Sequence, residues 1–302
     1  MSARNYPVFL VDAFTRERFR GNPALVVLGA GSLSAGEMRL LANELHHGDT
    51  AFVLPADGAD YDLRLRFFTP TREVPFVAHA TVAAHFALGV DRPAGAARVR
   101  QQTGAGIVEV EQRGGGGSRL IAMTISPPTL GQRLGDEDKG QVLDALGLSS
   151  AEIDPECPLE IAMKGSTRLI IGLKSVRQLE HLRPDLAQLR RLSANIGADG
   201  YFVFARAGAA DGCLTEARMF CPAIGIDEDP VSGNAHGMLA VYLHAHGLLR
   251  PANGRVAFAG LQGRALGRLG RVEVELALEG AHVARLTICG AAALVYRTTV
   301  EL

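Results

Sequence analysis

The sequence contains no tryptophan, few cysteines and no excess of either charge. Its four cysteines, at positions 157, 213, 221 and 289, are widely spaced and form no C-x-x-C pair. This pattern argues against a disulfide framework and against a zinc knot. The chain carries 31 basic and 32 acidic residues, a net charge of −1, and this balance lacks the positive patch that nucleic acid or a membrane surface attracts. We therefore expect no nucleic-acid partner.

Long apolar runs are also missing. No uncharged apolar run approaches the roughly 18 residues of a membrane span, and the N-terminal stretch lacks the apolar core of a signal peptide. We expect a cytoplasmic protein without membrane contact. The phosphate-binding, zinc-protease and hydrolase motifs are absent as well, and no cofactor or metal is predicted. Glu44, His46, His47 and Asp49 superficially resemble metal ligands, but histidines in a last helical turn already suit the helix dipole.

One stretch occurs twice in the chain. It reads "RFFTPTREVPFVAHATVAAHFALG" from Arg66 to Gly89 and "RMFCPAIGIDEDPVSGNAHGMLAVYLHAHG" from Arg218 to Gly247. Each copy begins as a strand, continues as a polar loop and ends as a long apolar helix. The segments before each copy also resemble one another at nearly the same offset. The repeat predicts two α/β halves with one plan, facing each other across a cleft.

The helices of the two copies are unusual in composition. The segments Ala80 to Leu88 and Ala235 to His246 contain no Asp, Glu, Lys or Arg, and a helix that is apolar all round is normally buried. Gly89 and Gly247 stand where left-handed C-caps are expected. The start of a helix gathers unpaired N–H groups and about half a positive charge. We therefore predict two anion-binding helix ends.

The remaining pattern predicts the order of elements and a domain boundary. A chain of 302 residues suggests about two domains, and Ser126 to Pro128 is the best boundary. This gives domains 1–127 and 128–302, with the last strand as a candidate to return to the first domain. Further expected elements are a helix capped by Ser34 and Glu37, strands at 8–13, 51–54, 61–68, 97–102, 106–112 and 120–125 with a hairpin tip at 114–117, helices at 139–146 and 186–196, and strands at 167–173, 271–278 and 283–295.

Polar residues gather beside the two apolar helices. The loops leading into them hold His79 in the first copy and Asp229, Gly233 and Asn234 in the second. When the copies are aligned on their prolines, His79 matches Asn234. Asp49 stands at a helix-to-strand corner near the same sheet edge. An imidazole and two carboxylates that converge on one cleft suit acid-base chemistry on a small substrate.

Each of these residues also has a structural interpretation. Asp49 follows a glycine and is able to bond its own turn. His79 is able to act as an N-cap-like group, and Asp229 before a proline is a common turn pair. The catalytic interpretation rests on the convergence of the three residues, not on any one of them.

The repeated motifs also carry a family resemblance. The segments "GNPALVV", "MRLLANELHHGDTAFVLP", "FFTPTREVPFVAHATVAA", "RMFCPAIGIDEDPVSGNAHGMLAVYL" and "LQGRALGRLGRVEVEL" together resemble the PhzF-like phenazine biosynthesis isomerase family, which shares the diaminopimelate epimerase fold. The resemblance implies an α+β fold of two pseudo-symmetric domains, each a mixed β-sheet rolled around a central helix. It also implies a homodimer whose active sites each lie between the two domains of a protomer. The characterised member isomerises trans-2,3-dihydro-3-hydroxyanthranilic acid without a cofactor.

The resemblance assigns roles to residues in the first half. The family's catalytic Glu falls on Asp49, which keeps a carboxylate and shortens its reach by one methylene. The family's Gly-His-Pro-Thr string falls on "AHAT", so that His79 is kept and Ala78 replaces Gly. Ala78 adds a methyl group beside the pocket floor, which suggests a different substrate.

In the second half, the family's Asp-Pro-x-Thr-Gly-Ser string falls on "DPVSGN". Asp229 is kept, whereas Ser232 replaces Thr and Asn234 replaces Ser. We expect the substrate carboxylate to bind the N–H groups at Gly233 and Asn234, where an anion is favoured.

The resulting hypothesis is a cofactor-independent isomerase acting on a small carboxylate-bearing molecule. Asp49 removes a proton from carbon and returns it elsewhere, while His79 and Asp229 orient an amino or hydroxyl group. A non-catalytic binding or regulatory protein derived from the same family is the alternative. A cysteine-based racemase is disfavoured, because no cysteine stands at either helix start and Cys221 aligns with Thr69.

Overall fold

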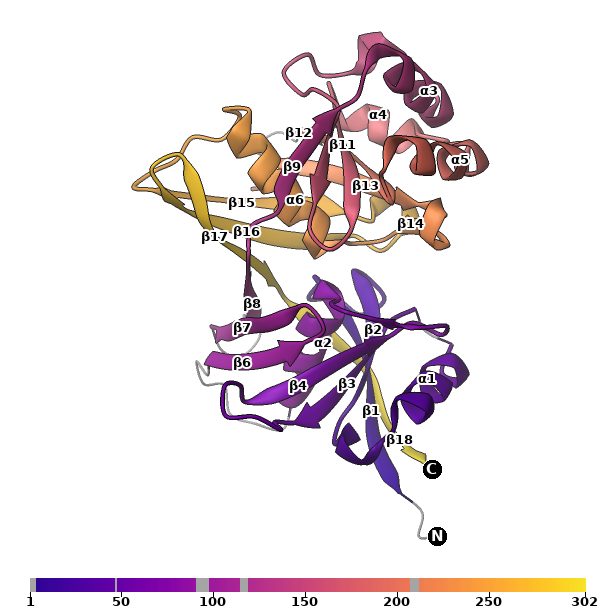
Figure 1. Ribbon diagram of the computed structural model, residues 1–302, viewed down its shortest axis with the longest axis vertical. Coiled ribbons are helices and arrows are strands. Elements are labelled where there is room, and N and C mark those ends of the chain that lie inside the picture. The colour runs from indigo at the N-terminus through magenta and orange to yellow at the C-terminus, as the bar shows by residue number, and fades with distance from the viewer. Residues whose placement is uncertain (1–3, 47, 91–97, 115–118, 207–211) are drawn as a thin grey trace. The chain divides into compact units, whose positions relative to one another are not determined.

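The computed structural model describes residues 4–46, 48–90, 98–114, 119–206 and 212–302. The chain forms two compact units, the first made of Met1–Ile125 and Cys289–Leu302 and the second of Ser126–Ile288 (Figure 1). Residue 97 of one predicted strand, residues 115–117 of the predicted hairpin tip, and His47 lie outside the described residues. No helix in the described ranges is long and apolar enough to span a membrane.

The first unit is built on a mixed sheet. Strand β1 pairs antiparallel with β18 and β2, β2 runs parallel to β3, β3 is antiparallel to β4, and β4 runs parallel to β6. Strands β6, β7 and β8 then form an antiparallel meander, and the short β5 pairs with β4. The strands are β1 (Asn5–Ala13), β2 (Asn22–Val27), β3 (Thr50–Pro55), β4 (Leu63–Phe68), β5 (Glu73–Val74), β6 (Arg98–Thr103), β7 (Gly106–Arg113), β8 (Leu120–Ile125) and β18 (Ala292–Glu301).

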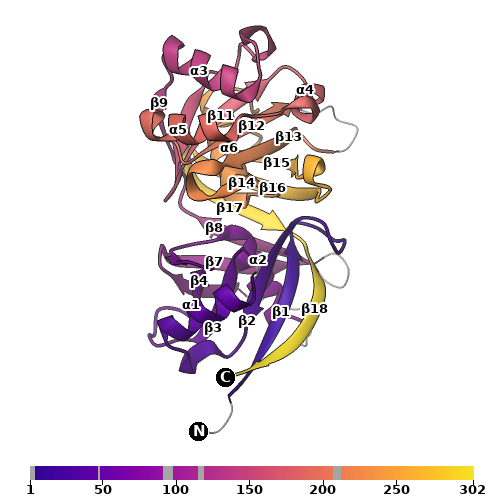
Figure 2. The same ribbon diagram turned by 90° about the vertical axis from the view of Figure 1, so that its right-hand side faces the viewer.

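Helices cover both faces of this sheet. Helix α2 (Ala78–Leu88) packs on the face that carries Val26, Ala51 and Phe67. Helix α1 (Ala35–Glu44) packs on the opposite face, which carries Phe52 and Phe68. Successive strand residues point to opposite faces, so neighbours such as Ala51 and Phe52 contribute to different cores. Figure 2 shows α2 and α1 flanking the strands.

The second unit repeats this arrangement. Its strands are β9 (Thr129–Arg133), β10 (Glu160–Met163), β11 (Thr167–Leu173), β12 (Gly200–Arg206), β13 (Thr215–Cys221), β14 (Ile226–Asp229), β15 (Arg255–Gln262) and β16 (Gly270–Glu279). Strand β11 runs parallel to β12, β12 is antiparallel to β13, and β13 runs parallel to β15, as β2, β3, β4 and β6 do in the first unit. The strand order therefore confirms the predicted repeat and the α+β class.

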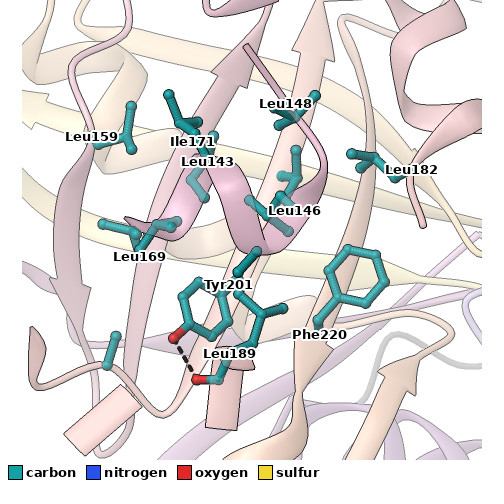
Figure 3. Packing of buried hydrophobic residues seen from close by; sticks show 14 of the residues in the cluster. Leu143, Leu146, Leu148, Leu159, Leu169, Ile171, Leu182, Leu189, Tyr201 and Phe220 are labelled. Carbon is teal, nitrogen blue, oxygen red and sulfur yellow. Dashed lines mark hydrogen bonds between the residues drawn. The ribbon is translucent and has the colours of Figure 1, made fainter. Parts of the chain in front are cut away.

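Successive strand residues of the second sheet also point to opposite faces. Helices α3 (Asp136–Leu146), α4 (Val176–His181) and α5 (Leu186–Ile196) cover the face that carries Tyr201. Figure 3 shows this core, in which the Tyr201 hydroxyl donates to the Leu189 carbonyl over 2.7 Å. Helix α6 (Gly233–Ala245) covers the other face, where the Phe202 and Phe204 rings contact His236 and Tyr242 edge-on. Each unit therefore buries one uncharged helix.

An ion pair recurs at the same place in both units. Arg66 on β4 bonds both carboxylate oxygens of Glu73, and Arg218 on β13 bonds both oxygens of Glu228. Each guanidinium also lies over the Phe two residues further along its own strand. The repeated Arg, Phe and Glu of the sequence thus fix the strand and the loop that precede each central helix.

Both central helices begin two residues earlier than predicted. Helix α2 starts at Ala78 after the N-cap Val77, and α6 starts at Gly233 after the N-cap Ser232. Both N-cap residues have extended backbones, and the helical conformation begins directly after them. The candidate site residue His79 therefore lies in a first helical turn and not in a loop, and it is not an N-cap.

Only one of the two predicted glycine caps is left-handed. Gly247 has φ +70°, as predicted, whereas Gly89 has φ −95°. A Cβ at 89 would lie 2.6 Å from Nη1 of Arg119, the far end of a flexible side chain, so this contact alone does not require glycine. That Arg119 nitrogen donates to the Gly89 carbonyl over 2.8 Å.

The predicted strand at 283–295 is two strands. Strand β17 (His282–Gly290) ends before Ala291, and β18 follows and pairs with β1 (Figure 2). The break coincides with Phe14, whose N–H donates to the Ala291 carbonyl over 2.7 Å. A Cβ on Gly290 would lie 2.4 Å from the Phe14 ring. The ring therefore requires glycine at the junction.

Each central helix buries one histidine, and this predicts a pH dependence of stability. Burial lowers the pKa of His85 and of His236 to about 4, whereas an unfolded histidine titrates near 6.5. Between these pH values the unfolded chain binds more protons than the folded chain. The two histidines should therefore lower the free energy of unfolding as pH falls from about 6.5 to about 4, by up to about 1.4 kcal/mol per pH unit each.

Urea unfolding at a series of pH values measures this slope. In the double variant His85→Gln, His236→Asn the slope should become shallower, because neither replacement titrates. An unchanged slope in the double variant would show that carboxylates alone cause the acid sensitivity.

Candidate active site

The first unit brings Asp49 and His79 together. Asp49 directly precedes β3, and its carbonyl accepts a hydrogen bond from Leu25 N on β2 over 3.1 Å. His79 is the second residue of α2. Its Nε2 lies 3.3 Å from Oδ2 of Asp49, and the two side chains are 13% and 21% exposed. The pair is thus partly desolvated but still reachable by a small molecule.

Asn22 determines which nitrogen of His79 carries the proton. The Asn22 amide nitrogen lies 3.3 Å from Nδ1 of His79, and an amide nitrogen only donates. Nδ1 therefore accepts, and in the neutral ring Nε2 carries the hydrogen and faces Asp49 across the 3.3 Å contact. The side chain of Asp49 contacts His79, so its role is not confined to its own turn.

Asn22 was not among the residues selected from the sequence. The available indication was the "GNP" string, in which Gly21 has φ +60° and a Cβ would lie 2.1 Å from the Ala13 carbonyl oxygen. Glycine is therefore required at 21. This turn places Asn22 at the start of β2, beside His79.

The second unit groups the other candidate residues around the start of α6. Asp229 ends β14, Ser232 is the N-cap of α6, and Gly233 and Asn234 form its first turn. The Ser232 hydroxyl accepts from Ala235 N over 3.3 Å. The first-turn N–H groups of such a helix favour an anion.

Asn234 adds a second polar feature to this helix start. Its Oδ1 is buried and has no hydrogen-bond partner within the described part of the chain. A buried acceptor without a donor is costly. A ligand with an N–H or O–H group close to its carboxylate is able to satisfy both the helix start and this oxygen.

Gln262 is the second residue that the sequence did not single out. Its Oε1 accepts from Ser232 N over 3.0 Å, and its Nε2 donates to the Asp229 carbonyl over 2.7 Å. This buried side chain therefore fixes both ends of the segment between Asp229 and α6. The indication lay in "LQGR", because Gly263 has φ +93° and a Cβ there would lie 2.7 Å from the Pro230 carbonyl oxygen.

The cysteines do not form a comparable site. All four are buried. Burial raises the pKa of Cys221 to about 12, and burial likewise raises that of Cys157 to about 12. Both side chains are therefore neutral thiols at pH 7, and a thiolate is the form that reacts.

Other groupings do not include the candidate residues. Among the described residues, no three His, Cys, Asp or Glu side chains come together as a metal site requires. A surface pocket of about 270 Å³ lies beside α4, where Leu148, Arg177 and His181 contribute to its wall. It is remote in sequence from the helix starts and contains none of the predicted site residues.

The role of Gln262 leads to a stability prediction. Gln262→Met preserves the side-chain length but leaves Ser232 N–H and the Asp229 carbonyl without their partner, which should lower the free energy of unfolding by about 1–3 kcal/mol. Urea unfolding measures the change. Gln132→Met is the control, since Gln132 is exposed on β9, and it should shift stability by less than about 0.5 kcal/mol. Equal effects of the two substitutions would contradict the assigned role.

Similarity to known proteins extends over nearly the whole chain. Residues 11–298 match the sequence model of the phenazine biosynthesis-like protein family. The chain is 38% identical over 299 residues to an uncharacterized isomerase of Clostridium acetobutylicum, covering 99% of each chain. It is 33% identical over 241 residues to the trans-2,3-dihydro-3-hydroxyanthranilate isomerase of Pseudomonas chlororaphis, covering 79% of this chain and 80% of that protein. A PhzF-family phenazine biosynthesis protein of Bacillus anthracis has the same fold, with a TM-score of 0.88, 25% identity and coverage of 99% and 100%.

Proposed function

Because the chain belongs to the phenazine biosynthesis-like protein family and is an isomerase, we propose that it moves a proton between two carbon atoms of a small carboxylate-bearing substrate without a cofactor. The observation that carries this proposal is the contact of 3.3 Å between Asp49 and His79. It provides a carboxylate base with an imidazole beside it in a partly desolvated place.

Asp49 is the proposed base. It removes a proton from a substrate carbon and returns it to another carbon of the same molecule, so no proton is consumed overall. The 3.3 Å contact with His79 holds one carboxylate oxygen. Closure of the site would reduce the solvation of the Asp49 carboxylate. A less solvated carboxylate takes up a proton more readily, and the neutral acid that it becomes then returns the proton to the other carbon.

The start of α6 is the proposed site for the substrate carboxylate. The N–H groups of Gly233 and Asn234 carry the positive end of the helix dipole. Ser232 caps this turn, and the buried Oδ1 of Asn234 accepts from an amino or hydroxyl group of the substrate. His79 and Asp229 would orient the same group, and Ala78 would limit the space beside it.

The two groups of residues belong to different units, and their convergence is part of the proposal. We place the reaction in a cleft between domains 1–127 and 128–302, with the last strand belonging to the first domain. A homodimer in the cytoplasm is the proposed form of the enzyme. Its partner is a small molecule, neither a nucleic acid nor a membrane.

The substrate class follows from the site and from one relative. A carboxylate for the helix start and a neighbouring amino or hydroxyl group for Asn234 are both present in trans-2,3-dihydro-3-hydroxyanthranilate, which the Pseudomonas chlororaphis relative is named for. By the family resemblance, Asp49 and Ala78 stand where a glutamate and a glycine are expected. We therefore propose a related cyclic amino or hydroxy acid as the substrate.

Hydrogen exchange tests the catalytic role of Asp49. The protein in D2O is offered this compound and a panel of small cyclic amino and hydroxy acids, and NMR follows deuterium on carbon. Asp49→Asn should slow the incorporation by about 10²–10⁴-fold, the usual contribution of a general base. Asp60→Asn is the control, since Asp60 is an exposed aspartate of the same unit.

The other outcomes are informative as well. Line broadening of a ligand without deuterium incorporation would replace the isomerase proposal with a non-catalytic binding protein. Incorporation that is equally fast in Asp49→Asn would show that another residue is the base.

A further inference from the structure

We propose that Thr81 in α2 and His236 in α6 are positioning residues, which orient the first turn of each central helix by hydrogen-bonding the N-cap carbonyl. Each residue lies four positions after its N-cap. The inference rests on the proposed function in one respect, because those first turns carry the residues assigned to catalysis and to carboxylate binding.

In the first unit, the carbonyl of Val77 accepts two hydrogen bonds from Thr81. The backbone N–H of Thr81 donates over 3.0 Å, and its hydroxyl donates over 2.9 Å. Thr81 is fully buried. The three residues enclosed by these bonds are Ala78, His79 and Ala80, so the bonds set the direction in which His79 leaves the helix.

The second unit has the same arrangement with a different side chain. The carbonyl of Ser232 accepts the backbone N–H of His236 over 3.2 Å and its Nδ1 over 2.9 Å. A carbonyl only accepts, so Nδ1 carries the hydrogen and Nε2 does not. The enclosed residues are those from Gly233 to Ala235, which form the proposed carboxylate site.

The surroundings of His236 hold its ring in one orientation. The Phe202 ring meets it edge-on with the ring centroids 5.3 Å apart. A Cβ on Gly260 would lie 2.6 Å from Cδ2 of His236 and 2.8 Å from the Thr215 hydroxyl oxygen. Glycine at 260 therefore leaves room for a ring that reaches back to Ser232.

The arrangement differs from that of helices α1 and α5. In α1 and α5 the N-cap carbonyls of Ser34 and Asp185 accept the backbone N–H of the residue four positions on. Those residues are Met38 and Leu189, whose side chains have no donor. The additional side-chain bond thus recurs at the two helix starts that carry candidate site residues. The donor is a threonine in α2 and a histidine in α6, and the acceptor in both helices is the N-cap carbonyl oxygen.

Matched substitutions separate positioning from folding. Thr81→Val removes the hydroxyl and preserves the shape, whereas Thr81→Ser keeps the hydroxyl. His236→Leu removes the donor, whereas His236→Asn places an amide nitrogen where Nδ1 was. The two variants of each pair change the same buried position. Only the conservative one keeps a side-chain hydrogen bond to the N-cap carbonyl.

The two removals should change different kinetic constants. Thr81→Val should lower kcat by about tenfold or more, since a misplacement of about 1 Å in a catalytic group costs up to about a hundredfold. His236→Leu should raise KM by a similar factor, because it loosens the carboxylate site. Thr81→Ser should keep most of the native kcat, and His236→Asn should keep KM close to its native value. Unchanged kcat and KM of the folded protein in both removals would overturn the proposal.

A measurement on the substrate-free protein keeps this test independent of the isomerase proposal. Amide hydrogen exchange should accelerate at residue 81 in Thr81→Val and at residue 236 in His236→Leu, because these N–H groups donate to the N-cap carbonyls, and it should stay near the native rate in the conservative variants. NMR of the His236 ring should show hydrogen on Nδ1. Uniform acceleration across each helix, or hydrogen on Nε2, would overturn the proposal even in an active enzyme.

Discussion

A helix that is buried on every side still has unpaired N–H groups in its first turn, and this constraint shapes both halves of the protein. Helices α2 and α6 contain no Asp, Glu, Lys or Arg and pack against their sheets along most of their length. Their starts are consequently the places where polar groups must gather. In each half, the preceding Arg–Glu ion pair and the doubly bonded N-cap carbonyl determine where that start lies.

The two halves share one architecture and present different polar groups at equivalent helix starts. At the start of α2, Asn22 and Asp49 fix an imidazole on both of its nitrogens. At the start of α6, Gln262 fixes the segment that leads into an uncharged turn with a buried amide oxygen. The first arrangement suits proton transfer, and the second suits an anion with a neighbouring donor. This division of roles is what the proposed isomerisation of a small amino or hydroxy acid requires.

Much of this fold could be predicted from local sequence, and the remainder depends on distant contacts. The strand at 167–173, the helix at 186–196 and the capping box of Ser34 and Glu37 agree with the structure, because each is set by residues within a few positions. The repeat and the family resemblance were also correct. Gly290 could not be interpreted locally, since it makes room for the ring of Phe14, which is far away in sequence. Asn22 and Gln262 could not be predicted as site residues for the same reason, because their partners lie 57 and 30 residues away.

A crystal structure of the Asp49→Asn variant with its substrate tests the central claim most directly. The account predicts that the substrate carboxylate binds the N–H groups of Gly233 and Asn234 while the reacting carbon faces residue 49. In that complex His79 should contact the same ligand. A substrate whose carboxylate binds elsewhere, or whose carbon atoms lie out of reach of residue 49, would contradict the account.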